Sequence, residues 1–201
     1  MPTAVVDRPA PPLPNEPWRK RWTRQECAVL ESSGLLDNQH LELVEGELIN
    51  KMGKKWPHGR SQSALFGWLM RLFGEQFVCA EMPINVAPED NPTSEPEPDL
   101  ILLARTLWQI QSNPGPEDLR LVIEIADTTL QLDLTTKAGL YARAGIADYW
   151  VLDVRGRRLI VNREPQQGVY QSVIAYNEEE SVSPLAAPDH EFPVAQAFPG
   201  E

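Results

Sequence analysis

The sequence has few cysteines and no long apolar run, and these two shortages exclude several classes of protein. Cys27 and Cys79 are the only cysteines among the 201 residues, so a disulfide framework like that of a small secreted domain is not expected. Neither has a partner at the spacing of a metal site, and we interpret both as small core residues. No apolar run approaches the roughly 20 residues that cross a bilayer as a helix. We therefore expect a soluble chain with no membrane partner.

The beginning of the chain lacks the continuous apolar stretch of a secretory signal. Its first 17 residues hold six prolines and few large apolar side chains, a composition typical of disorder. We therefore predict a disordered, proline-rich N-terminal tail over residues 1–21 and a cytoplasmic location. Residues 22–198 are predicted to form one domain, because roughly 100 to 200 residues is an ordinary domain length.

Positive charge is also scarce. Lys and Arg number 18 against 29 Asp and Glu, which gives a net charge of −11. Such a surface repels the phosphate backbone over most of its area, which excludes indiscriminate DNA binding. The basic residues nevertheless form three clusters: Arg19, Lys20, Arg21 and Arg24; Lys51, Lys54, Lys55, His58 and Arg60; and Arg155, Arg157 and Arg158. The pattern leaves open whether each cluster is a local phosphate track or a solvated surface run.

Hydrophobic periodicity divides the domain into strands and helices. Thr23 and Glu26 have the spacing of a capping box and predict a helix to about Ser32. LELVEG and ELINK alternate around Glu45-Gly46 and predict a hairpin. Apolar residues three and four apart predict a helix over 57–74. Residues 76–87 have an extended pattern, and PDLILLA and RLVIEIA are typical of short buried strands.

A strand, a helix and a further strand follow one another over residues 119–154. Asp133 is predicted to cap the helix at its start and Gly145 to end it, before the apolar strand DYWVLDV. This order favours a right-handed parallel crossover. RRLIVNR, GVYQSVIAY and EFPVAQAF are predicted to complete the sheet, so the fold class is α/β.

Two carboxylates stand where an apolar strand should carry none. Asp99 opens PDLILLA and Glu124 interrupts RLVIEIA, and burying a carboxylate is costly unless it is paired or binds a metal. Two acids on neighbouring strands can share one Mg²⁺, which prefers oxygen ligands and lowers the pKa of a bound water. For Asp99 the alternative is a Pro-Asp turn into the strand. For Glu124 it is a salt bridge to Arg120 or Lys137.

Lys137 is the candidate cation beside these acids. It stands three residues after Leu134 and four before Tyr141, next to the apolar stripe of the predicted helix. It is therefore expected to point toward the carboxylates, where an ammonium group can steady developing phosphate charge. The alternative is an ordinary lysine at the edge of the stripe with its amine in solvent.

The order of these motifs resembles one family of proteins. ELVEGELI, PHGRSQSAL, PDLILLA and the block LVIEIADTTLQLDLTTKAGLYARAGIADYWVLDV are followed by SVSPLAAPDHEFPVAQAF. Together they are similar to the Uma-two family of restriction-endonuclease-like proteins, over residues 22–198. The resemblance implies a restriction-endonuclease-like PD-(D/E)XK fold, with a mixed central β-sheet flanked by α-helices.

The resemblance also implies roles for the acids and the lysine. Asp99 matches the aspartate of the PD motif, and Glu124 matches the glutamate of the second half-motif. Ala126 departs from the superfamily, because it stands where the usual motif has its lysine. The resemblance implies that Lys137, on the following helix, supplies the amine instead.

Further site residues come from the same comparison. Glu45 matches an early glutamate of the family and is expected to join the metal site with the Ile125 carbonyl, although a hairpin-turn acid is the alternative. The family often has a histidine at the position of His58, where the start of a helix can meet a phosphate. A capping or packing role fits His58 as well. With Lys55 and Arg60, it is expected to bind the substrate.

The sequence therefore predicts a Mg²⁺-dependent endonuclease, with Mn²⁺ as a substitute metal and nucleic acid, above all DNA, as the partner. Asp99 and Glu124 hold the metal in this hypothesis, and Lys137 positions water. A homodimer is expected by analogy with restriction enzymes. The alternative, favoured by Ala126, is a catalytically inactive PD-(D/E)XK adaptor that binds nucleic acid or a protein. A third hypothesis is a homodimer subunit that acts on something other than DNA.

Overall fold

A computed structural model describes residues 19–36, 39–51 and 55–199. The predicted tail therefore lies almost wholly outside the described residues, as does Lys54 of the second basic cluster. Within the described ranges, no helix is long and apolar enough to span a bilayer. Cys27 is buried and Cys79 is half-buried, and both are free thiols.

A six-stranded mixed sheet forms the centre of the molecule, in the order β3-β4-β5-β6-β7-β8. β5 and β6 are parallel, and the other neighbours pair antiparallel. The parallel pair and the helix between its strands confirm the predicted crossover. The strands are β3 (Val78–Ala80), β4 (Leu100–Leu103), β5 (Leu119–Ala126), β6 (Asp148–Asp153), β7 (Arg158–Gln166) and β8 (Val169–Asn177).

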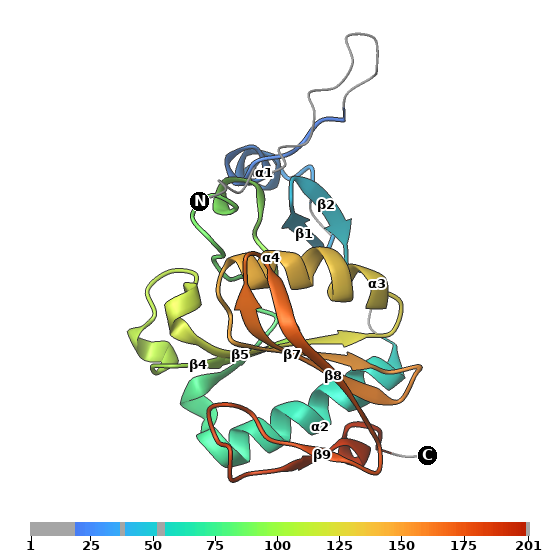
Figure 1. Cartoon of the computed structure of the whole chain (residues 1–201). Coiled ribbons are helices and arrows are strands. Elements are labelled where there is room, and N and C mark those ends of the chain that lie inside the picture. Colours follow the sequence, from blue (N-terminus) through green and yellow to red (C-terminus); the bar gives the residue numbers. More distant parts are fainter. Residues whose placement is uncertain (1–18, 37–38, 52–54, 200–201) are drawn as a thin grey trace, which may run out of the picture.

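Helices cover both faces of this sheet (Figure 1). α2 (Trp56–Phe73) lies on one face. On the other lies a helical segment made of α3 (Leu130–Leu132), a π-helical turn (Asp133–Lys137) and α4 (Ala138–Arg143). Single-turn 3₁₀ helices lie at Glu75–Phe77, Asn91–Thr93, Leu107–Gln109, Pro116–Asp118 and Val194–Ala197. The fold class is the predicted mixed α/β.

Alternation along β5 divides the core into two layers. Leu121 and Ile123 belong to the cluster beneath α2, whereas Val122 and Ala126 belong to the cluster on the α3–α4 side. Successive strand side chains point to opposite faces. Glu124 therefore faces the same side as Val122 and Ala126, toward the helix that follows β5.

The N-terminal part packs beyond the α3–α4 layer (Figure 1). It holds α1 (Arg24–Ser32) and the hairpin of β1 (Leu41–Val44) and β2 (Glu47–Asn50). The capping box of Thr23 and Glu26 is present as predicted. The hairpin is a sheet of its own, joined to residues 91–97 through backbone hydrogen bonds from Gly46 to Thr93 and from Glu95 to Leu43.

Three predictions about the elements were wrong. EFPVAQAF does not join the central sheet, because β10 (Phe192–Pro193) pairs with β9 (Ser181–Val182) and a 3₁₀ turn follows. Of residues 76–87, only Val78–Ala80 is a strand. Asp133 does not cap the helix, which already begins at Leu130. The buried position of Asp133 is set by the tertiary structure instead of by capping.

Candidate active site

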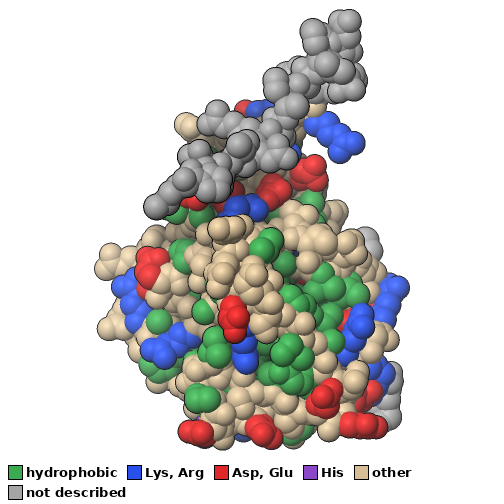
Figure 2. Space-filling view, viewed as in Figure 1, with side chains coloured by type: hydrophobic (Ala, Val, Ile, Leu, Met, Phe, Trp, Pro, Cys, Tyr) green, Lys and Arg blue, Asp and Glu red, His purple; other side chains and the backbone are tan. Residues whose placement is uncertain are grey.

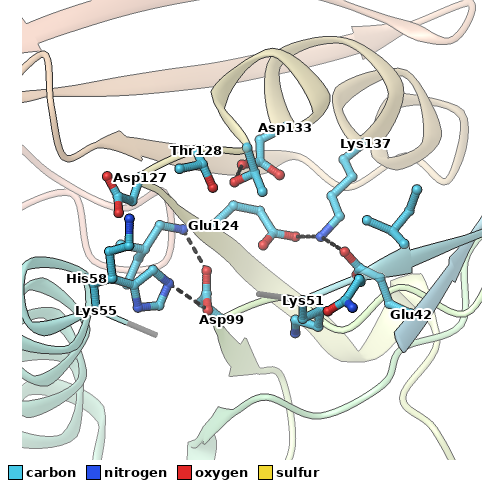
Figure 3. A pocket seen from close by; sticks show the side chains of 14 residues that line it. Glu42, Lys51, Lys55, His58, Asp99, Glu124, Asp127, Thr128, Asp133 and Lys137 are labelled. Carbon is cyan, nitrogen blue, oxygen red and sulfur yellow. Dashed lines mark hydrogen bonds and ion pairs between the residues drawn. The ribbon is translucent and has the colours of Figure 1, made fainter. Parts of the chain in front are cut away.

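A small pocket of about 90 Å³ lies where several distant segments meet. They are β1, the end of β2 with Lys51, the start of α2, the residue before β4, the end of β5 and the helix that follows it (Figure 3). The acidic and basic side chains that line it are Glu42, Lys51, Lys55, His58, Asp99, Glu124, Asp127, Asp133 and Lys137. The fold thus gathers acids and bases that the sequence keeps far apart.

Lys137 lies between two carboxylates in this pocket (Figure 3). Its Nζ donates to Oε1 of Glu124 at 2.9 Å and forms an ion pair with Oε1 of Glu42 at 2.9 Å. All three side chains are buried. The Tyr141 hydroxyl also donates to Oε1 of Glu124, at 2.9 Å. Lys137 is therefore an internal cation fixed on both sides, and the alternative of an amine in solvent does not describe it.

The π-helical turn sets the position of this lysine. Asp133 and Lys137 are its first and last residues, and both are buried. Such wide turns are rare and frequently occur at functional sites. Because the turn lies over the face of β5 that carries Glu124, it presents both charged ends to the pocket.

Asp99 is held by the neighbouring strand and by α2. Its Oδ2 accepts the backbone N–H of Ile125 at 2.8 Å, and its Oδ1 lies 3.2 Å from Nε2 of His58 (Figure 3). Nδ1 of His58 is buried and has no hydrogen-bond partner in the part of the chain that the structure describes. Asp99 is therefore held beside β5, and His58 contacts it directly.

The pocket is lined by more acids than lysines: Glu42, Asp99, Glu124, Asp127 and Asp133 against Lys51, Lys55 and Lys137. Burial raises the pKa of Glu124 to about 8. The charge of Lys137 lowers this pKa, whereas the neighbouring acids Asp133, Asp99 and Glu42 raise it further. Burial likewise raises the pKa of Asp133 to about 6. Burial alone would lower the pKa of Lys137, but Glu124, Glu42 and Asp133 together raise it above its ordinary value. Lys137 therefore stays charged, whereas Glu124 retains a proton at neutral pH that a bound cation would displace.

The donor set suits a hard divalent cation. Within the described ranges, no three His, Cys, Asp or Glu side chains are grouped closely enough to hold a metal by themselves. Asp99, Glu124 and Ile125 nevertheless line one pocket. Mg²⁺ is often held by only one or two carboxylates, with water and substrate phosphate as its other ligands. The excess of acids over lysines and the oxygen donors fit such an ion.

Six predicted site residues come together in this pocket, and two do not. Those that line it are Lys55, His58, Asp99, Glu124, Ile125 and Lys137. Arg60 lines an adjoining groove instead. Glu45 lies in the β1–β2 turn with a φ of 48°, and its Oε1 accepts from Nη2 of Arg143 at 2.6 Å. The structure thus places Glu45 outside the pocket, in the turn that was its alternative assignment.

Sequence reasoning missed three acids of the pocket, Glu42, Asp127 and Asp133, and the Tyr141 hydroxyl beside it. Glu42, and not Glu45, is the hairpin acid that enters the pocket: its Oε1 pairs with Lys137, and a backbone N–H from Glu97 donates to its Oε2 at 3.1 Å. Its signal was the period of two in LELV, which puts Glu42 on the same face as the buried Val44. Asp133 and the Tyr141 hydroxyl carried no signal that distinguished them from a helix cap and a core aromatic.

The raised pKa of Glu124 predicts how stability varies with pH in the metal-free protein. The ordinary pKa of 4.5 applies to the unfolded chain and about 8 to the folded one, so between these values the folded chain binds the extra proton. The free energy of unfolding should therefore fall as the pH rises from about 5 to 8. Urea unfolding in a chelator across this range measures the fall.

The variant Glu124→Gln isolates the contribution of Glu124 to this pH dependence. Glu124→Gln should remove most of the fall between pH 6 and 8, because Asp133 titrates lower, at about 6. Carboxyl groups with a lowered pKa, such as Asp118 beside Arg105, act below pH 4.5 and do not overlap this range. A stability that is constant or rises from pH 5 to 8 would contradict the assigned direction.

Comparison with known proteins shows the family and the fold of the chain. The family model Uma2, described as "Putative restriction endonuclease", matches residues 28–195. A solved structure described as "a putative nuclease belonging to DUF820 from Anabaena variabilis ATCC 29413" aligns with a TM-score of 0.59 and 16% sequence identity, over 80% of this chain and 90% of that one. At this identity the likeness shows the fold. None of the curated proteins compared with the chain matches it.

Proposed function

The chain belongs to the Uma2 family, and from that premise we propose that it is a divalent-metal-dependent endonuclease that hydrolyses phosphodiester bonds in nucleic acid, DNA above all. Family and fold together suggest a restriction-endonuclease-like nuclease. The observation that carries the finer proposal is the buried acidic pocket with one lysine held between Glu42 and Glu124. Metal binding and cleavage would both depend on this cluster.

Asp99, Glu124 and the Ile125 carbonyl would hold the metal, for which Mg²⁺ and Mn²⁺ are the candidates because the donors are oxygens. When bound, such an ion lowers the pKa of water and offsets charge on a phosphate. The Ile125 N–H holds Asp99 through its Oδ2. The Tyr141 hydroxyl and Lys137 hold Glu124 through its Oε1. Both acids are therefore positioned before any ligand arrives.

Lys137 would supply positive charge to the reacting phosphate. Its amine is kept protonated by the surrounding acids, and burial makes its field stronger than that of a solvated lysine. Glu42 is a positioning residue in this scheme, because it holds the amine from the side away from Glu124. The amine that the superfamily places two residues after the glutamate thus comes from the helix, and Ala126 no longer favours the inactive adaptor.

The proposal is tested by metal binding and cleavage together. Calorimetric titration with Mg²⁺ and Mn²⁺, and nicking of supercoiled plasmid with either ion or with excess chelator, use the intact chain. We expect micromolar to millimolar metal binding and cleavage that stops when the chelator is added. An intact chain that binds no metal and cuts no nucleic acid would refute the endonuclease and favour the adaptor.

A further inference from the structure

A second groove adjoins the candidate active site. It has a volume of about 380 Å³ and is lined by the start of α2, the turn between β6 and β7, and the C-terminal residues Phe198 and Pro199. These segments lie on one side of the molecule in Figure 1. Asp127 lines both this groove and the pocket. The pocket and the groove are therefore adjacent, and Asp127 forms part of the wall between them.

Sheet topology brings basic residues to this wall. β5 and β6 are parallel, so their carboxyl ends lie at the same edge of the sheet. The Val154 N–H donates to the Ala126 carbonyl at 3.0 Å, and Arg155 follows immediately. Its Nε donates to Oδ1 of Asp127 at 2.8 Å, while its side chain remains 65% exposed. The β6–β7 turn thus places the exposed guanidinium group of Arg155 beside the pocket.

The charged lining of the groove is mostly positive. It consists of Arg60, Arg155, Arg157 and Asp127, in a chain whose net charge is −11. Arg60 is exposed, and no ion pair links it to another residue within the described part of the chain. The Arg157 guanidinium lies 4.9 Å from the ring centroid of Phe198 and pairs with Glu178. It is therefore fixed at the wall.

We infer that this groove binds the backbone phosphates of a single nucleic-acid strand that extends from the phosphodiester held in the active site. The inference rests on the proposed function, because it assigns the neighbouring part of the same substrate. A strand that leaves the pocket past Asp127 enters the groove directly. Arg60 and Arg155 contact its phosphates, and the apolar lining from Pro57, Val154 and Pro199 suits sugars and bases.

Charge favours a single strand over a duplex. On the face shown in Figure 2, the basic and acidic side chains of the described residues are interspersed and form no broad basic area. A duplex carries twice the charge along its axis and would bring a second backbone against the acidic surface. The groove offers a short positive track, which is enough for the flank of one strand.

The test is binding of a labelled single-stranded oligonucleotide, measured by fluorescence anisotropy in a chelator at several salt concentrations. The double variant Arg60→Gln/Arg155→Gln is expected to bind about 10- to 100-fold more weakly than the intact chain. Its plot of log affinity against log salt should be shallower by about 1.4, since each lost phosphate contact removes about 0.7 on a single strand. Arg71→Gln/Arg120→Gln is the matched control, because both arginines are exposed and lie outside the groove.

Each result decides a separate question. Unchanged affinity and slope in the groove variant, or an equal loss in the control, would overturn the inference. A duplex of the same sequence that binds as tightly as the strand would overturn the single-strand assignment. If the intact chain and the groove variant cleave plasmid equally well, the nuclease proposal stands but the groove inference fails. If the groove binds the strand but no metal-dependent cleavage is seen, the groove inference stands and the nuclease proposal fails.

Discussion

Replacing Asp99 by asparagine is expected to abolish metal binding and cleavage together. The asparagine side chain keeps the size of the original and an oxygen for the Ile125 N–H, so the fold should survive, but the substitution removes a charged ligand. Loss of an outer partner of a ligand commonly costs about 10- to 100-fold in metal affinity, and loss of the ligand should exceed this. Calorimetry with Mg²⁺ or Mn²⁺ and plasmid nicking measure the two effects.

Glu45→Gln is the matched control for this variant. Glu45 is also a carboxylate of the N-terminal half, but it lies in a turn and pairs with Arg143 at 2.6 Å. Its substitution should leave metal affinity and cleavage within about twofold of the intact chain, because surface ion pairs contribute roughly 0 to 1 kcal/mol. Cleavage that persists in Asp99→Asn, or that vanishes in Glu45→Gln, would show that the cutting centre lies elsewhere.

Lys137→Met is expected to reduce cleavage while metal binding persists, and to destabilise the metal-free fold. Removing one member of a buried ion pair costs about 3–5 kcal/mol, and here Glu42 and Glu124 would both lose their cation. Cleavage should fall about 100- to 1,000-fold, by analogy with other charge-stabilising groups. Metal binding should persist, because the proposed ligands are intact and less positive charge opposes the ion.

Two comparisons make this result interpretable. Lys51→Met removes another lysine of the pocket, but Lys51 is partly exposed and lies 3.7 Å from Glu97, so a loss under about 1 kcal/mol is expected. Lys137→Met/Glu42→Gln should recover much of the stability lost in Lys137→Met, since it removes one uncompensated acid. Urea unfolding at pH 7 measures all three variants. A Lys137→Met protein as stable as the intact chain would exclude the buried ion-pair cluster.

Local periodicity was enough to predict the part of the site that one strand-helix-strand unit builds. Glu124 interrupts an apolar strand, where a carboxylate needs a cation as partner, and Lys137 stood beside the apolar stripe of the following helix. The parallel crossover followed from the same pattern. These features depend on contacts between segments that are adjacent in the chain.

Glu42 and Asp133 depend on information that no local pattern contains. The β1–β2 hairpin forms its own sheet, so nothing in its alternation indicates where it docks, only that Glu42 and Val44 share a face. Asp133 was interpreted as a helix cap because aspartate is a favoured residue at that position. A π-helical turn begins at Asp133 instead, and the helix starts earlier, at Leu130.

The separation of Glu42, Asp99, Glu124 and Lys137 along the chain has a consequence for when the pocket forms. Contacts between residues distant in sequence are slow to close, because the intervening chain must lose its freedom first. The hairpin with Glu42 is synthesised early, yet its partner Lys137 leaves the ribosome much later. An unfinished chain therefore carries separate, solvated acids, and the complete cluster exists only once the whole domain has folded. For the proposed nuclease, this order of assembly withholds cutting activity from nascent and misfolded chains.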